Sequence, residues 1–168
     1  DGKTGDNLIK ENTIISAAEI GVLATVGKST VKVAKQPKVM IVSTGDELVK
    51  VDEIPLAHQI RRSNVFTLVS LLERLHIPSE TAHITDDKSI LKEKIKSYLE
   101  NYDVLLFSGA VSKGKFDFLP EVLEGLHVEK LFHKVAQRPG KPFWMGVVNT
   151  NQKQTNVFAF PGNPISTF

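Results

Sequence analysis

The stretch Val39-Met40-Ile41-Val42-Ser43-Thr44-Gly45-Asp46-Glu47 decides the fold. Its first four residues form a continuous apolar run, which is typical of a strand buried on both faces of a sheet. A polar loop follows at once, and Gly45 within it permits a tight turn. Because ligands of open α/β sheets bind beyond the carboxyl ends of the strands, this loop is a candidate binding segment.

Apolar runs and helical periodicities alternate along the rest of the chain. We expect further strands over residues 80–84, 104–107, 128–135, 143–148 and 157–160, and helices over residues 65–75, 90–99 and 118–126. Short, wholly apolar strands that alternate with amphipathic helices favour a mostly parallel sheet covered on both faces. The predicted fold class is therefore α/β, in three α/β/α layers.

The first 35 residues have a different pattern. Ser16 and Glu19 have the spacing of a capping box, which predicts a short helix, and Gly27 is placed to end it. Residues 30–33 alternate as a strand does. We predict that residues 1–35 are the end of a neighbouring linker or β region and that residues 36–168 are the α/β core.

Composition excludes several classes of protein. The 168 residues include 21 Lys and Arg against 19 Asp and Glu, a net charge of +2, which leaves no broad footprint for nucleic acid or acidic membranes. The absence of cysteine excludes disulfide scaffolds, thiolate zinc sites and cysteine nucleophiles. No apolar run approaches the ~20 residues of a membrane helix. We expect no nucleic-acid or membrane partner, and a cytoplasmic location, because cysteine-free composition fits a reducing compartment.

Two further loops join the one at residues 43–47. Ser63-Asn64 opens a predicted helix, where free backbone N–H groups can hold an anion. Of Asp86 and Asp87, one is expected to cap the next helix, and the other could hold a hard cation such as Mg²⁺. Taken alone, each loop is more simply explained as a hydrogen-bonded turn or a helix cap.

Residues 108–117 form the predicted loop with the most small and charged residues of the kinds that bind anions and metals. Gly109 to Lys115 has the glycine–lysine spacing of a phosphate-binding P-loop, but Phe116 replaces the Ser or Thr that would meet Mg²⁺. This argues against a functional P-loop NTPase, and a nucleotide-dependent phosphotransferase stays as an alternative. What remains is an anion cradle of small residues, with Asp117 placed to cap the next helix or to hold a metal.

The segment Arg138-Pro139-Gly140-Lys141-Pro142 places two cations on a stiff loop. Its prolines restrict the backbone and Gly140 permits close approach, so the two cations suit a phosphate or another tetrahedral oxyanion. Pro161-Gly162-Asn163-Pro164 reads as a rigid turn after the last predicted strand.

Taken in order, these loops resemble those of molybdopterin molybdenumtransferases, the MoeA family that includes the gephyrin E domain. The resemblance implies that the activity is insertion of molybdate into adenylylated molybdopterin, with Mg²⁺-assisted release of AMP. It implies a homodimer in the full-length protein, with an adenylyltransferase supplying the substrate. Family members also carry a lid region and a C-terminal β domain that this sequence does not show, so we expect little activity from the chain alone.

The resemblance also assigns roles by position. The catalytic residues would be Glu47, Asp86, Asp117 and Lys134, of which Glu47, Asp86 and Asp117 would hold the metal. The substrate-binding residues would be Thr44, Gly45, Asp46, Ser63, Asn64, Ser108, Gly109, Ser112, Gly114, Arg138, Lys141, Pro142, Pro161, Gly162 and Asn163. Three departures from the family pattern are Ala110 in place of a second glycine, Arg138 in place of a common lysine, and Arg61-Arg62 where an acidic residue is frequent.

Two alternatives share the fold. Molybdopterin adenylyltransferases are expected to carry a Thr-Gly-Gly-Thr-Gly loop and an Arg-Asp pair, and neither is found here. A non-catalytic scaffold module is the other alternative, against which the presence of Glu47, Asp86 and Asp117 argues.

Overall fold

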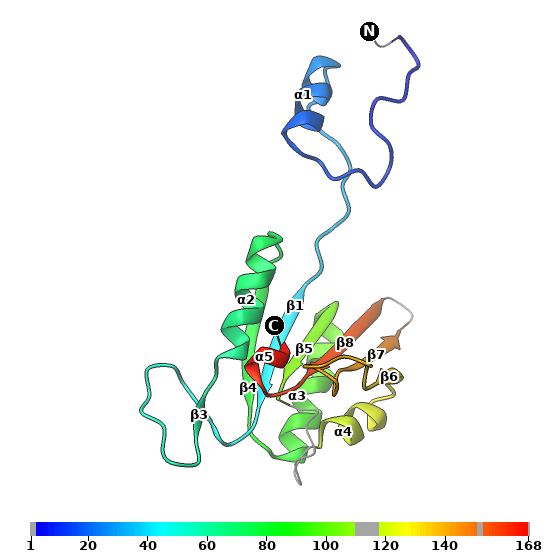
Figure 1. Ribbon diagram of the computed structural model, residues 1–168. Coiled ribbons are helices and arrows are strands. Elements are labelled where there is room, and N and C mark those ends of the chain that lie inside the picture. The colour runs from blue at the N-terminus through cyan, green and yellow to red at the C-terminus, as the bar shows by residue number, and fades with distance from the viewer. Residues whose placement is uncertain (1–2, 110–117, 151–152, 168) are drawn as a thin grey trace. The chain divides into compact units, whose positions relative to one another are not determined.

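The computed structural model describes residues 3–109, 118–150 and 153–167, and the chain divides into two compact units, residues 1–35 and 36–168 (Figure 1). In the first unit, helix α1 (Ala17–Thr25) begins with the expected capping box between Ser16 and Glu19. The helix ends as expected, because Gly27 has φ +74° and the N–H of Lys28 reaches back to the carbonyl of Leu23 at 2.9 Å.

The prediction of a strand at residues 30–33 is wrong. These residues carry the alternating pattern, but the described part of the first unit contains no strand. A strand needs a partner to accept its backbone hydrogen bonds, and within residues 3–35 none is present.

The second unit is built on a six-stranded sheet in the order β4-β1-β5-β8-β7-β6. The strands are β1 (Val39–Thr44), β4 (Ser79–Ile84), β5 (Val104–Ser108), β6 (Glu129–His133), β7 (Trp144–Asn149) and β8 (Gln154–Phe160). Strands β4, β1, β5 and β8 pair in parallel, whereas β7 is antiparallel to both of its neighbours. The mostly parallel α/β sheet predicted from the apolar runs is therefore confirmed.

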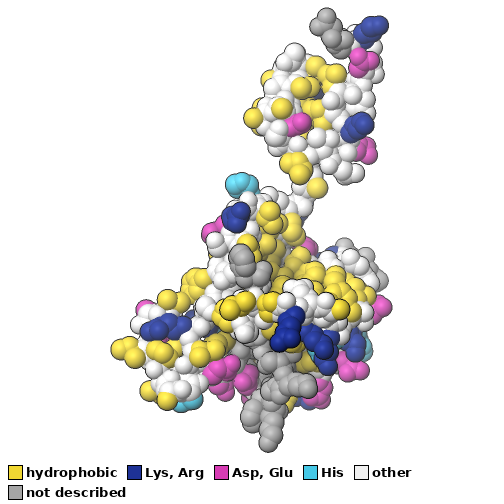
Figure 2. All heavy atoms as spheres, viewed as in Figure 1, with side chains coloured by type: hydrophobic (Ala, Val, Ile, Leu, Met, Phe, Trp, Pro, Cys, Tyr) yellow, Lys and Arg dark blue, Asp and Glu magenta, His cyan; other side chains and the backbone are white. Residues whose placement is uncertain are grey.

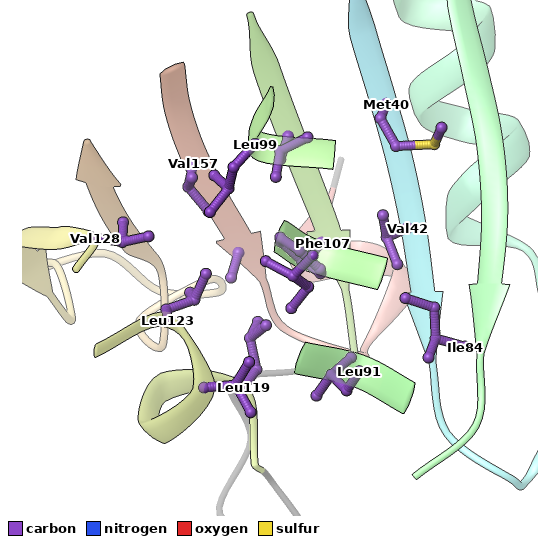
Figure 3. Packing of buried hydrophobic residues seen from close by; sticks show 14 of the residues in the cluster. Met40, Val42, Ile84, Leu91, Leu99, Phe107, Leu119, Leu123, Val128 and Val157 are labelled. Carbon is purple, nitrogen blue, oxygen red and sulfur yellow. The ribbon is translucent and has the colours of Figure 1, made fainter. Parts of the chain in front are cut away.

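Helices cover both faces of this sheet. One face packs against α3 (Lys88–Asn101) and α4 (Leu119–Gly125), and the other packs against α2 (Asn64–Arg74). In Figure 3, Leu91 and Leu119 lie with Phe107 of β5 in the larger of the two cores. Successive residues of a strand point to opposite faces, so the wholly buried run in β1 serves both cores.

Short elements complete the second unit. A two-stranded parallel ladder joins β2 (Leu48–Val49) to β3 (Ile60–Arg61), and α5 (Pro164–Thr167) follows the last strand. No helix within the described ranges has the length and apolar character needed to cross a membrane.

Candidate functional site

The carboxyl ends of four parallel strands bring the predicted loops to one edge of the sheet. The backbone N–H of Asp86, after β4, donates to Oδ1 of Asp46, after β1, at 3.1 Å. The N–H of Gly109, after β5, donates to the carbonyl of Phe160, at the end of β8, at 3.2 Å. These two contacts connect the loops in neighbouring pairs, so the sites predicted separately form one rim.

Close backbone approach explains Gly109 at this rim, and Gly162 lies in ordinary contact with it. Gly109 has φ +95°, and a Cβ there would lie 3.3 Å from the carbonyl oxygen of Thr44. A Cβ on Gly162 would lie 3.6 Å from Cα of Gly109. The loops after β1, β5 and β8 therefore meet through backbone atoms rather than through side chains.

The two neighbouring aspartates have different local roles. Asp87 is the N-cap of α3, because its carboxylate accepts from the N–H groups of Ser89 and Ile90 at 2.8 and 2.9 Å. The expectation that one aspartate caps the helix is confirmed. Asp86, half-buried beside Asp46, is left without a capping role.

Glu47 is the other predicted acid that the structure describes, and its carboxylate makes no hydrogen bond to Asp46 or Asp86. Glu47 folds back over Gly45, where a Cβ would lie 2.7 Å from the Glu47 carboxyl carbon. Within the described ranges, no three His, Asp or Glu side chains converge as metal ligands. Asp117, together with the substrate-binding candidates Ser112 and Gly114, lies outside the described residues.

The α2 side of the rim holds a cavity of about 240 Å³. Ser43 and Ser108 are paired across β1 and β5, and both line it. They face α2 because Ile41 and Leu106, two residues earlier in each strand, belong to the α2 core. Thr44, one position further along β1, points to the opposite face. The rim is therefore divided by the sheet into two sides.

Asn64 is the polar side chain at the start of α2. It is 7% exposed, and its Nδ2 donates to the carbonyl of Gly162 at 3.0 Å, which connects the helix to the loop after β8. Ser63 is the N-cap residue, but its side chain makes no capping hydrogen bond to α2. The simple capping interpretation of Ser63-Asn64 is therefore wrong, because the only side-chain link from this pair to a described residue comes from Asn64 and crosses to another loop.

The basic loop lies between β6 and β7. It is closed by hydrogen bonds from Lys134 N to Phe143 O at 2.8 Å and from Val135 N to Lys141 O at 2.9 Å. Lys134, Arg138 and Lys141 are all exposed. Figure 2 shows a group of Lys and Arg side chains on the viewed face of the larger unit and a separate group of Asp and Glu side chains.

Aromatic packing and one glycine hold this loop near the end of β8. The ring of Phe143 stacks on that of Phe158, with the ring centroids 6.2 Å apart, and its centroid lies 5.3 Å from that of Phe160. Gly140 has φ +98°, and a Cβ there would lie 3.4 Å from the carbonyl of Ser166 in α5. The segment from Gly140 to Phe143, which contains Pro142, is thus held near the end of β8 and near α5.

His133, immediately before Lys134, has a perturbed pKa. Desolvation, followed by the positive charges of Lys134 and Lys130, lowers the pKa of His133 below its ordinary value of 6.5. The same lysines therefore make the β6 end of the loop a positively charged environment.

The sequence matches the family described as the probable molybdopterin binding domain over residues 40–167. The chain belongs to this family. Every loop of the rim described above falls within the match.

Curated relatives carry a more specific name. A molybdopterin molybdenumtransferase from Synechocystis is 39% identical over 168 residues, which is 99% of this chain and 43% of the relative. A molybdopterin molybdenumtransferase from Staphylococcus aureus is 36% identical over 167 residues, covering 99% of this chain and 39% of the relative. The chain thus spans about two fifths of the length of these relatives.

Solved structures agree with the family. The molybdopterin biosynthesis MoeA protein from Pyrococcus horikoshii superposes with a TM-score of 0.72 at 32% identity, covering 91% of this chain and 37% of the other. The tungsten cofactor synthesizing protein MoaB from Pyrococcus furiosus superposes with a TM-score of 0.56 at 16% identity, covering 80% and 88%. The second similarity shows a shared fold alone.

Sequence reasoning placed Ser43 in a candidate loop, but it assigned neither Ser43 nor Arg62 a role at the rim of the molybdopterin binding domain. Ser43 lines the cavity and its Oγ lies 3.0 Å from Nδ1 of His83, its register partner on β4. Arg62, half-buried, also lines the cavity. Strand alternation could have indicated Ser43, since Val39 and Ile41 share its face, but nothing in the local sequence pairs it with His83.

Proposed function

We propose that this chain is the substrate-binding core of a molybdopterin molybdenumtransferase, which inserts molybdate into adenylylated molybdopterin and releases AMP. One observation carries the proposal: the basic loop at residues 134–142 and the carboxylates of Asp46 and Asp86 belong to loops that follow strands of one sheet and are connected through its rim. Residues 1–35 would be the end of a preceding region. The names of the curated relatives support the reaction class.

The basic loop would hold anions. Arg138 presents a planar fork of donors that matches two oxygens of a tetrahedral oxyanion, and Lys141 adds a point charge three residues away. Lys134 stands where the chain leaves β6 and would complete the cationic side. The prolines restrict the loop, which lowers the conformational entropy lost when an anion binds.

The acidic side would hold Mg²⁺. Magnesium in proteins is usually held by one or two carboxylates, water and substrate phosphates, so Asp86 would hold this cation, with Glu47 and Asp117 as the other candidate ligands. Bound there, Mg²⁺ would neutralise charge on the phosphates of the substrate. The chain's own contribution is to keep the Asp86 loop in place through the hydrogen bond to Asp46.

The remaining parts of the proposal concern the whole protein. We expect a homodimer in the cytoplasm, with a molybdopterin adenylyltransferase as the source of substrate. Because the chain spans about two fifths of its curated relatives, we expect weak activity from the chain alone.

The test is AMP release from adenylylated molybdopterin in the presence of molybdate and Mg²⁺. The chain is assayed alone and as a chimera, in which it replaces the matching segment of the Synechocystis relative. We expect slow release from the chain and robust release from the chimera, reduced by Lys141→Met but not by Lys96→Met on the exposed side of α3. A folded chimera that releases no AMP, or equal release by both variants, contradicts the proposal.

A further inference from the structure

The cavity on the α2 side contains a buried acceptor without a donor. Oδ1 of Asn64 has no hydrogen-bond partner among the described residues, although the side chain is 7% exposed. Buried carbonyl oxygens are nearly always hydrogen-bonded, and an exception needs an explanation. Asn64 lines the cavity, so a ligand placed there can supply the missing donor.

The orientation of the amide is determined by its other end. Nδ2 donates to the carbonyl of Gly162 at 3.0 Å. Exchanging the two amide atoms would set the side-chain oxygen against that carbonyl oxygen, so Oδ1 must be the atom left unpaired. Asn64 therefore offers the cavity an acceptor, and a ligand must bring an N–H or O–H group.

We propose that this cavity binds the exocyclic amino group of a flat nitrogen heterocycle, which donates to Oδ1 of Asn64. The apolar side chains of Leu48, Ile60 and Val65 line the cavity and suit the faces of a ring. The hydroxyl groups of Ser43 and Ser108 can each donate or accept, as the nitrogens at a ring edge require. The proposal rests on the proposed function, because that substrate carries such rings.

The size and charge of the cavity exclude two other occupants. At about 240 Å³ it is smaller than the ~300 Å³ at which pockets for drug-sized ligands begin, so one ring system fits and a whole nucleotide–pterin substrate does not. Arg62 and the start of α2 would attract an oxyanion, but an oxyanion brings no donor and would face the lone pairs of Oδ1. An amino heterocycle can donate the hydrogen bond that Oδ1 of Asn64 lacks.

Two parts of adenylylated molybdopterin share this chemistry. Adenine carries a 6-amino group and the pterin carries a 2-amino group. Each is compared with an analogue that has an oxygen there: AMP with inosine monophosphate, and pterin-6-carboxylate with lumazine-6-carboxylate. Calorimetry on the 168-residue chain gives the two affinity ratios, which a uniform weakening of binding does not change.

We expect one of the two pairs to be distinguished about fivefold to tenfold in favour of the amino compound, as for one neutral hydrogen bond. The ratio should fall to about one in Asn64→Leu and should be kept in Asn101→Leu, a matched exposed asparagine on α3. The pair that is distinguished identifies adenine or pterin as the occupant. No preference in either pair, or a preference kept in Asn64→Leu, overturns the proposal.

A second measurement needs no variant. In the unmodified chain, the side-chain amide resonances of Asn64 should shift on titration with the preferred amino compound and not with its oxo analogue. If Asn64→Leu fails to fold, unchanged Asn64 resonances alone overturn the proposal. AMP release by the chimera is measured separately, so a wrong assignment of this cavity leaves the proposed function standing, and a failed AMP assay leaves the affinity ratios interpretable.

Discussion

The carboxylate of Asp46 holds the loop that contains Asp86, because Asp46 Oδ1 accepts from the Asp86 N–H at 3.1 Å. This contact joins residues 40 positions apart in sequence and fixes the backbone of Asp86 beside the Asp46 carboxylate. Asp46→Ala should therefore weaken Mg²⁺ binding about 10- to 100-fold, as loss of a supporting hydrogen bond does in metal sites. Calorimetry with Mg²⁺ and AMP measures the effect.

Asp46→Asn separates two possible roles of Asp46, which are holding the Asp86 loop through a hydrogen bond and contributing a negative charge. The amide oxygen can still accept from Asp86 N–H, while the negative charge is gone. If the role of Asp46 is to hold the loop, the asparagine variant should keep most of the affinity that the alanine variant loses. Equal losses in the two variants would mean that Asp46 acts through its charge instead.

Gly109 should be intolerant of any side chain. It has φ +95°, and a Cβ would lie 3.3 Å from the carbonyl oxygen of Thr44. Gly109→Ala is expected to lower the free energy of unfolding by more than about 1 kcal/mol, since alanine is strained at positive φ. Gly125→Ala is the control, because no heavy atom lies within 4 Å of the added Cβ and φ is not positive. Urea unfolding should show destabilisation only for the first variant.

Substitutions at Ile95 and Ile90 test which face of α3 packs against the core. Ile95 is fully buried in the core beneath the sheet, whereas Ile90 on the same helix is 45% exposed. Ile95→Ala should cost about 2–5 kcal/mol of unfolding free energy, from lost burial and the cavity left behind. Ile90→Ala should cost less, and equal costs in thermal or urea unfolding would contradict the helix orientation.

The layered fold could be predicted because its signal is local. Each buried strand of the parallel part is a short apolar run, and α3 shows helical spacing of Leu91, Ile95 and Leu99. The strand order could not be predicted, since β5 pairs with β8 about 50 residues later and nothing in either strand specifies that partner. The β2–β3 ladder was missed for the same reason, as two residues carry no period.

The candidate site was predictable as a set of loops and not as a set of contacts. Position after a predicted strand was enough to select the loops at Asp46, Asp86 and Gly162. The bond from Asn64 to Gly162 spans 98 residues, and the contact of Ser43 with His83 spans 40. Such partners depend on strand order, so the unpaired oxygen of Asn64 became visible only in three dimensions.

His133 should make stability depend on pH. Desolvation, Lys134 and Lys130 lower its pKa below 6.5, so between the two pKa values the unfolded chain binds more protons than the folded chain. Stability from this group is therefore present above about pH 6.5 and is lost as the pH falls through the lower, folded pKa. Acidification should favour unfolding.

The measurement is urea unfolding at about pH 7.5 and at a series of pH values falling from about 6.5. His133→Gln should lose less stability than the unmodified chain between these conditions, because glutamine does not titrate. An unchanged pH dependence in His133→Gln would show that the lysines beside the basic loop do not act on this histidine.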